Sequence, residues 1–266
     1  MSEAIAHPAV RGGLRAWLRR RELVLHLAGR QLSSTHRRTA LGWSWPLLVQ
    51  LAQLAVLVFL FGRVLRLDIA HYPTFVFSGL IFWAWLQSGV TAAAGAVTDG
   101  AALVREPKMP TMVLPLVAIA VTGFDLLIAL PILLVMVHAT VGLTWSLAFL
   151  PVLLIVQAAL MAGLALLVSA AHVHVRDVKP LVGVFFLIVF YLTPVFYDLN
   201  VVPESFRTLY DVNIFATLVN GYHSVFMEGA VPDLGPLAIV AAVAVVVLVA
   251  GIAAFRRLSP GFVDEL

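Results

Sequence analysis

Stretches of about 20 apolar residues recur along the chain, and each is long enough to cross the hydrocarbon core of a bilayer as a helix. Of the 266 residues, 62% are hydrophobic and 12% are charged. Soluble domains carry about 25% charged residues, so this chain lacks the polar side chains that a water-exposed surface needs. We therefore predict an all-α polytopic membrane protein, folded as a single transmembrane domain over residues 1–266. The six predicted spans lie near 44–65, 73–97, 112–137, 147–171, 180–197 and 234–255.

The positive charges predict which side each loop faces. Residues 1–43, the loops at 98–111 and 172–179, and the tail at 256–266 together hold 14 of the 17 Lys and Arg residues. Lys and Arg concentrate on the cytoplasmic side of membrane proteins, so we predict that both termini are cytoplasmic. The sequence pI of 9.6 then reflects topology, and nucleic acid is excluded as a partner.

Residues 1–43 predict an amphipathic helix that lies in the cytoplasmic membrane interface. Its apolar side chains recur at roughly helical spacing, while most arginines fall elsewhere around the helix, where they would meet anionic lipid or a partner. A leader that only sets topology by its charge is the alternative. The apolar residues are Leu14, Trp17, Leu18, Leu25, Ala28 and Leu32.

Residues 198–233 are neither a clear span nor a polar loop, and they predict short helices that dip into the membrane from outside without crossing it. Aromatic residues are dense on the spans that approach this outer side. Flat aromatic faces can stack on sugar rings, so we predict a substrate path here, although an interfacial aromatic belt would give the same density. The predicted path residues are Tyr72, Phe82, Trp83, Trp85, Phe186, Phe190, Tyr191, Phe196 and Tyr197.

Two predicted cytoplasmic loops contain candidate contact residues. Residues 103–110 combine mixed charge with two prolines, which indicates either a rigid elbow gripped by a soluble partner or a tight solvated turn. In the second loop, His172 and His174 would need a third ligand to bind a metal, so we predict no metal site. Arg176 and Asp177 are better suited to an interfacial ion pair.

Asp125 lies near the middle of the third predicted span, where an ionised carboxylate costs about 2.5–3.5 kcal/mol. It must face protein or water, either as a proton or substrate contact or as a structural hydrogen-bonding group. The sequence contains no nucleotide-binding P-loop, no HExxH zinc motif and no paired carboxylates at catalytic spacing. If this chain moves a substrate uphill, a partner must supply the energy.

Taken in order, several segments resemble the membrane permease subunits of ABC exporters for lipid-linked polysaccharides, the class that exports O-antigen, teichoic acid and cell-wall galactan. The resemblance covers nearly the whole chain. It rests on the segments Arg37 to Pro46, Tyr72 to Pro73, Ser78 to Trp83, Leu103 to Pro110, Leu114 to Pro115, Arg176 to Asp177, Thr193 to Tyr197, and Phe262 to Leu266.

The resemblance implies a homodimer in the bacterial inner membrane, bound to two copies of a separate ATPase that carries ATP and Mg²⁺, with no cofactor in this chain. It also implies that residues 198–226 gate the outer mouth and that a polyprenyl-diphosphate-linked polysaccharide passes through. The 15 Arg against 2 Lys suggest a GC-rich genome and favour galactan as the cargo. The implied coupling helix comprises Leu103, Val104, Arg105, Glu106, Pro107 and Lys108, and the implied cytoplasmic gate and interface residues are Arg37, Arg38, Arg176 and Asp177.

Two other classes of function remain. An ion-coupled secondary transporter would use Asp125 and His138. An intramembrane enzyme acting on lipid-linked saccharide would need catalytic carboxylates in a large outer loop, and residues 198–233 are short and apolar.

Overall fold

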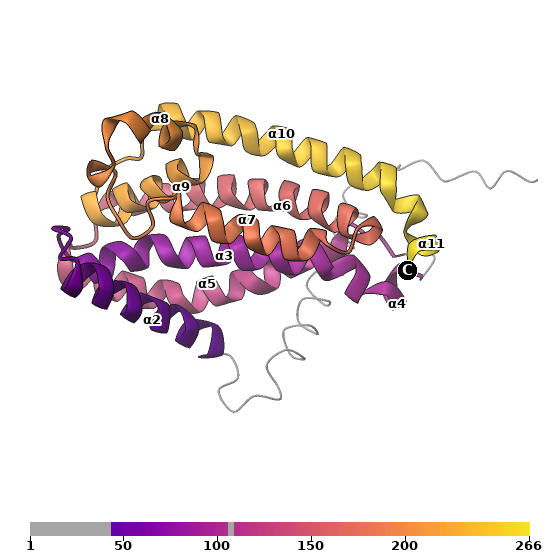
Figure 1. The fold of residues 1–266 in the computed structure, drawn as a ribbon, viewed down its shortest axis with the longest axis horizontal. Coiled ribbons are helices and arrows are strands. Elements are labelled where there is room, and N and C mark those ends of the chain that lie inside the picture. The colour runs from indigo at the N-terminus through magenta and orange to yellow at the C-terminus, as the bar shows by residue number, and fades with distance from the viewer. Residues whose placement is uncertain (1–43, 106–108) are drawn as a thin grey trace, which may run out of the picture.

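The computed structural model describes residues 44–105 and 109–266, and within these ranges the chain is helical with no β-strand (Figure 1). The predicted amphipathic helix, Arg37, Arg38, and residues 106–108 of the predicted coupling helix lie outside the described residues. The all-α class is confirmed.

Five helices in the described part of the chain are long and apolar enough to cross a membrane. They match the first, second, third, fourth and sixth predicted spans. In chain order they are α2 (Trp45–Leu57) with its π-helical continuation η2 (Val58–Val64), α3 (Tyr72–Asp99), α5 (Val113–Thr140), η3 (Trp145–Phe149) with α6 (Leu150–His174), and α10 (Leu234–Leu258).

The fifth predicted span, 180–197, corresponds to α7 (Val178–Tyr191) and was predicted too long at its outer end. Pro194 explains the early end, because proline disfavours helical geometry in the residue before it and cannot donate a main-chain hydrogen bond. At about 1.5 Å per residue, the 14 residues of α7 extend about 21 Å, less than the roughly 30 Å hydrocarbon core. A count of six spans therefore stays a prediction.

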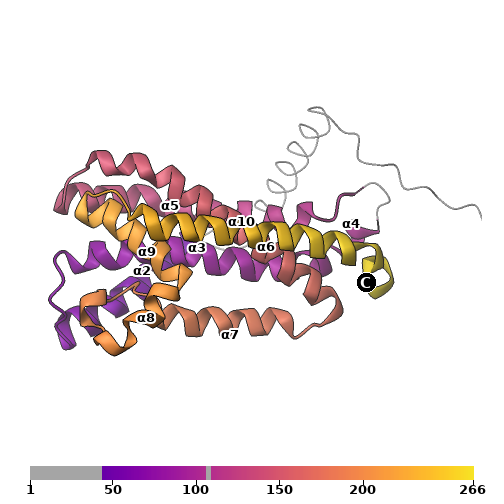
Figure 2. The same cartoon turned by 90° about the horizontal axis from the view of Figure 1, so that it is seen from above.

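The long helices lie side by side along one direction (Figures 1 and 2). Helix α3 is the most buried of the five and packs against α2, α5, α6 and α7. Helices α6 and α10 approach each other closely at Gly163 and Gly251. A Cβ atom on Gly163 would lie 2.6 Å from the main-chain nitrogen of Leu248, and one on Gly251 would lie 2.5 Å from the main-chain oxygen of Gly163. These two helices therefore form a pair in direct main-chain contact.

The short helices occupy opposite ends of the bundle (Figures 1 and 2). At one end lie α8 (Glu204–Val212), α9 (Ile214–His223) and the π-helix η5 (Ser224–Glu228). We call this the gate end and include in it residues 192–197. At the other end lie α4 (Ala101–Val104), η6 (Ser259–Gly261) and α11 (Phe262–Glu265), which we call the elbow end together with the turn at 175–177.

The separation of the short helices into two ends agrees with the division into cytoplasmic and outer segments that the positive charges predict. The described parts of all three segments predicted to be cytoplasmic, in the loops 98–111 and 172–179 and the tail 256–266, meet at the elbow end. Residues 198–233 form short helices at the gate end, and neither α8 nor α9 is long enough to cross a bilayer. Which end faces the cytoplasm stays a prediction.

Candidate functional site

A buried polar network fixes α9 to the bundle at the gate end. The hydroxyl of Tyr222, which is 0% exposed, donates to Oε1 of Gln157 on α6 at 2.8 Å. Nε2 of Gln157 donates to the main-chain carbonyl of Phe82 on α3 at 2.9 Å. The rings of Phe82 and Tyr222 stack with centroids 3.7 Å apart and planes at 2°. One tyrosine therefore joins α9 to two long helices by both polar and apolar contact.

A second contact joins α9 to α3 where α3 carries a glycine. A Cβ atom on Gly79 would lie 2.9 Å from Nε2 of His223 and 3.2 Å from the main-chain oxygen of Val195. The His223 ring also packs on Phe75, with centroids 4.0 Å apart. Only glycine at position 79 leaves room for this imidazole and for the 192–197 segment at once.

The segment between α7 and α8 is held by hydrogen bonds from both sides. Asn213 caps α9, since its Oδ1 accepts from the main-chain nitrogens of Phe215 and Ala216 at 3.0 and 3.3 Å. Its Nδ2 donates to the carbonyl of Leu192 at 3.0 Å. From α3, the hydroxyl of Tyr72 donates to the carbonyl of Phe196 at 2.7 Å. The gate end is thus connected to α3 through the turn segment 192–197 as well as through α9.

Sequence reasoning gave no role to Gln157 or to the Asn213 cap, although signals existed for both. Gln157 is the only polar side chain within the apolar stretch 150–168. Asn213 directly precedes an apolar run, which is the usual position of a helix N-cap. What the sequence could not supply was the partner of either side chain.

The structure buries six of the nine predicted path residues within this single chain. Tyr191 is exposed, Trp85 and Tyr197 are half-buried, and Trp85 donates to the carbonyl of Ile119 at 3.4 Å. The buried side chains would contact a sugar only after helices separate, so their place in a path stays a prediction. The six are Tyr72, Phe82, Trp83, Phe186, Phe190 and Phe196.

Three of these aromatics gather with Phe215 of α9. Trp83 of α3 lies with its ring centroid 6.0 Å from Phe186, 5.8 Å from Phe190 and 6.1 Å from Phe215. Beside this cluster, an apolar depression of about 280 Å³ opens between α7 and α9, lined by Phe185, Val189, Leu192, Val212, Asn213, Ile214 and Phe215. Helices α3, α7 and α9 therefore share one aromatic contact region.

At the elbow end, α4 follows α3 almost without interruption. Gly100 separates them, and a Cβ atom there would lie 2.9 Å from the carbonyl of Ala96 and 3.1 Å from Cδ1 of Leu114. Of the predicted coupling helix, Leu103 is half-buried, Val104 is buried, and Arg105 is exposed. Arg105 Nη2 donates to the main-chain oxygen of Leu266 at 2.8 Å. The loop thus begins as a short helix attached to α3 and touched by the tail.

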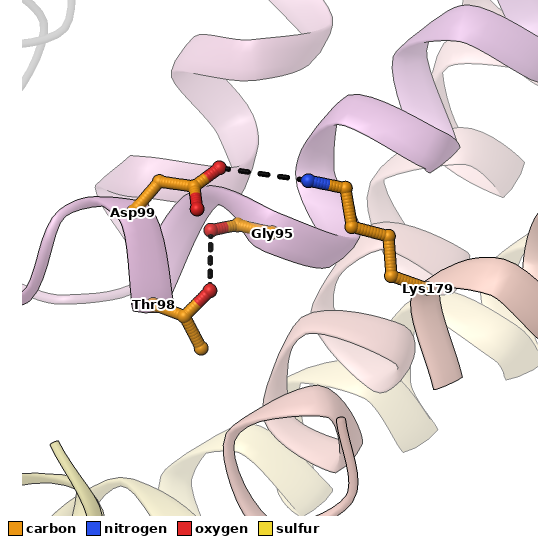
Figure 3. Close-up of polar contacts among 4 residues, drawn as sticks. All are labelled: Gly95, Thr98, Asp99 and Lys179. Carbon is orange, nitrogen blue, oxygen red and sulfur yellow. Dashed lines mark hydrogen bonds and ion pairs between the residues drawn. The ribbon is translucent and has the colours of Figure 1, made fainter. Parts of the chain in front are cut away.

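An ion pair links the end of α3 to the start of α7 (Figure 3). Nζ of Lys179 lies 3.6 Å from Oδ2 of Asp99, and the two side chains are 42% and 72% exposed. Gly95 lies beneath this pair, and its carbonyl accepts a hydrogen bond from Thr98 Oγ1 at 2.9 Å. A pair as exposed as this contributes little to stability, at most about 1 kcal/mol.

The other predicted elbow-end residues are placed as follows. Arg176 and Asp177 are exposed in the turn between α6 and α7, and neither forms an ion pair with another described residue. His174 lies with Nδ1 3.6 Å from Oε1 of Glu265. No group of three potential metal-ligating residues occurs in the part of the chain that the structure describes.

Asp125 is half-buried on α5, beside the exposed Phe124. His138 is exposed near the end of the same helix. Ion coupling through these two residues stays a prediction.

The described part of the chain is an all-α bundle with five helices long and apolar enough to cross a membrane, a buried central helix and short helices at both ends, which is the architecture of a polytopic membrane protein. Comparison of the sequence with family models then shows that the chain belongs to the ABC-2 type transporter family, with residues 22–227 matched. The resemblance to ABC exporter permeases is therefore confirmed.

Individual relatives match over almost their full length. The chain is 31% identical to the O-antigen export system permease protein RfbA of Myxococcus xanthus, covering 92% of this chain and 96% of that protein. It is 24% identical to the O-antigen export system permease protein RfbA of Klebsiella pneumoniae, covering 92% of this chain and 95% of the relative.

Proposed function

We propose that this chain is the transmembrane subunit of an ATP-driven ABC exporter that moves a polyprenyl-diphosphate-linked polysaccharide of the O-antigen type out of the cytoplasm. Two copies of the chain and two copies of a separate ATPase form the exporter in the bacterial inner membrane. ATP and Mg²⁺ bind to the ATPase, and this chain is a transport subunit without enzymatic activity. The family match and the permease relatives support this proposal.

The observation that carries the proposal is that one continuous helix, α3, contacts the gate end and also leads into the elbow end. Helix α3 contacts the gate helix α9 through Phe82 and Gly79 and leads at its other end through Gly100 into the elbow. Its 28 residues extend about 42 Å, roughly the full thickness of a bilayer. A displacement imposed on the elbow by a partner would therefore reach the gate through a single rigid element.

The partner ATPase follows from the family, which implies such a subunit, and from the sequence, which contains no nucleotide-binding P-loop. We place both termini and the elbow in the cytoplasm, where Leu103, Val104, Arg105 and the turn with Arg176 and Asp177 would meet the ATPase. The exposure of the last three residues supports their availability to a partner.

A second copy of the chain would cover apolar surfaces that one chain leaves exposed. Helix α2 exposes Trp45 and Val49, its continuation η2 exposes Phe59, and α7 exposes Leu181 and Ile188. A second copy facing these helices would enclose a path between the two chains. The aromatic residues of α3 and α7 would line it once the gate end opens.

Cell-wall galactan is a second candidate for the cargo. It is favoured by the Arg-rich composition, which reflects the organism's genome and gives no information about the substrate site. The names of the relatives favour O-antigen. Export assays with both polymers are needed to separate them.

The test is co-expression with an ABC-type ATPase subunit from the same genome, followed by purification through a tag on this chain. We expect a complex containing both subunits, and ATP-dependent transfer of lipid-linked polysaccharide in inverted membrane vesicles. If no ATPase is bound and transport instead follows a proton gradient and is lost in Asp125→Asn, the exporter proposal fails and the secondary transporter replaces it. His138→Gln serves as the second variant in that arm.

A further inference from the structure

A tail segment, residues 259–266, folds back against the elbow after α10 ends. Helix α10 stops at Leu258, the 3₁₀ turn η6 reverses the chain, and α11 returns toward α4 (Figures 1 and 2). Neither the family match nor the names of the relatives assign anything to these residues, and the matched region ends at residue 227.

The centre of this contact is Phe262, which is 0% exposed. Its ring meets that of Phe255 on α10 edge to face, with centroids 5.2 Å apart and planes at 88°. It also lies 6.1 Å from the ring of His174, the last residue of α6. Through these ring contacts the buried Phe262 fixes the tail segment to the ends of α6 and α10.

The same ring belongs to a separate apolar cluster that includes the elbow itself. Helices α3, α4, α5, α6, α10 and α11 each contribute a buried side chain, so a shift of α4 relative to the bundle would disturb the packing around Phe262. The cluster comprises Val97 of α3, Val104 of α4, Leu114 of α5, Leu166, Ala170 and Val173 of α6, Phe255 of α10, and Phe262 of α11.

Polar contacts add to this at the edge of the cluster. Arg105, the first residue after α4, donates to the main-chain oxygen of Leu266 at 2.8 Å. Glu265 lies 3.6 Å from His174, which directly precedes the second predicted cytoplasmic turn. The tail segment therefore touches the elbow at Arg105 and the last residue of α6, directly before the turn that we assign to the ATPase interface.

We propose that the tail segment is a strut that holds the coupling elbow in register with α6 and α10, with Phe262 as its positioning residue. This proposal rests on the proposed function, because it concerns how ATPase movement reaches the membrane helices. With the tail segment in place, a displacement of α4 by the ATPase moves α4 and α3 together. Without it, the chain bends at Gly100 and the displacement of α4 does not reach α3.

The test uses the complete complex and three substitutions in α11. Phe262→Ala removes the buried ring, Phe262→Leu keeps most of its volume, and Val263→Ala changes a neighbouring side chain that is 53% exposed. For each variant, bound ATPase, ATP hydrolysis and exported polysaccharide are measured per molecule of permease in vesicles.

We expect Phe262→Ala to retain the ATPase and its hydrolysis while export per ATP falls about 2- to 30-fold, the range seen for substitutions that alter coupling between sites. Phe262→Leu should recover most of the coupling, and Val263→Ala should match wild type. If Phe262→Ala does not reach the membrane, the intermediate loss in Phe262→Leu provides the same measurement.

Two results would overturn the strut. One is unchanged export per ATP in both Phe262 variants, and the other is a proportional fall of hydrolysis and export, which indicates only a loss of folded protein. Failure of the proposed function gives a different result, because wild-type permease would then bind no ATPase or export without ATP.

Discussion

The gate end and the elbow end of this bundle are stabilised by different kinds of contact. At the gate end, buried hydrogen bonds join residues far apart in the chain, as between Tyr222 and Gln157, or Tyr72 and Phe196. At the elbow end, the polar contacts of Lys179 and Arg105 are exposed, and a small apolar cluster provides the buried contact.

This difference has a physical meaning for a transport subunit. A buried hydrogen bond is not weakened by competing water, and leaving its partner unpaired is costly, so the gate end favours one defined arrangement. Exposed ion pairs are screened and contribute little, so they exchange readily for contacts with another protein. Under the proposed function, the gate end would hold a closed state and the elbow end would accept a partner.

The largest loss of stability should come from removing Tyr222, which makes both a buried hydrogen bond and a ring-stacking contact at the gate end. Tyr222→Ala deletes a fully buried ring that stacks on Phe82, and such truncations cost about 3–5 kcal/mol. We expect a marked drop in the temperature at which the purified permease unfolds in detergent. Tyr210→Ala is the control at the gate end, because Tyr210 is only half-buried. Equal effects of the two substitutions would contradict a gate held by its buried network.

The second effect isolates the hydrogen bonds from the packing. Gln157→Leu keeps the volume on α6 but leaves the Tyr222 hydroxyl without its acceptor, which should cost about 1–3 kcal/mol. Adding Tyr222→Phe removes the unpaired hydroxyl and should recover part of this loss. A double-mutant cycle of unfolding free energies measures the coupling. Strictly additive losses would mean that this hydrogen bond does not stabilise the gate.

The third prediction compares the same substitution at both ends of one helix. At Gly79 a methyl group would meet a buried imidazole and a main-chain oxygen, whereas at Gly95 it would meet the flexible end of Lys179 at 2.6 Å. Alanine is favoured over glycine in helices by about 1 kcal/mol, so Gly95→Ala should be neutral or stabilising. Gly79→Ala should be less stable than Gly95→Ala by about 1–2 kcal/mol, because a tightly packed site resists added volume. Thermal unfolding of the two variants under one condition tests this difference, and its reversal would remove the distinction between the ends.

The sequence predicts the long helices well because a membrane span is a local property of the chain. Length and hydropathy alone predict the spans 112–137 and 234–255, and the bounds of α5 and α10 agree closely with them. The predicted fifth span was wrong at residues 192–197, since these are apolar and aromatic but form turns and bends instead of a helix. Hydropathy does not distinguish a helix from an apolar turn segment that receives hydrogen bonds from other elements, here from Tyr72.

The candidate site is less accessible to sequence reasoning, because its contacts are between distant residues. Gln157 lies 65 residues from Tyr222 and 75 from Phe82, so its pairing appears only once α3, α6 and α9 are packed. The elbow could be located from its prolines and charges, and the tail segment from its resemblance to the family. That Phe262 packs beneath the elbow could not be inferred, since nothing local in the tail specifies which helix ends it meets.

The smallest effect should come from the exposed pair at the elbow end. Lys179→Gln removes an ion pair whose members are 42% and 72% exposed, and we expect a loss of less than about 1 kcal/mol that disappears at high salt. Unfolding of Lys179→Gln and of wild type, each at low and high ionic strength, provides the measurement. Arg207→Gln, which removes a pair with Glu204 at 4.0 Å on α8, is the matched control at the gate end. If Lys179→Gln instead costs as much as Gln157→Leu, or its cost is independent of salt, the elbow end is held by its own charges, and its readiness to exchange them for a partner no longer follows.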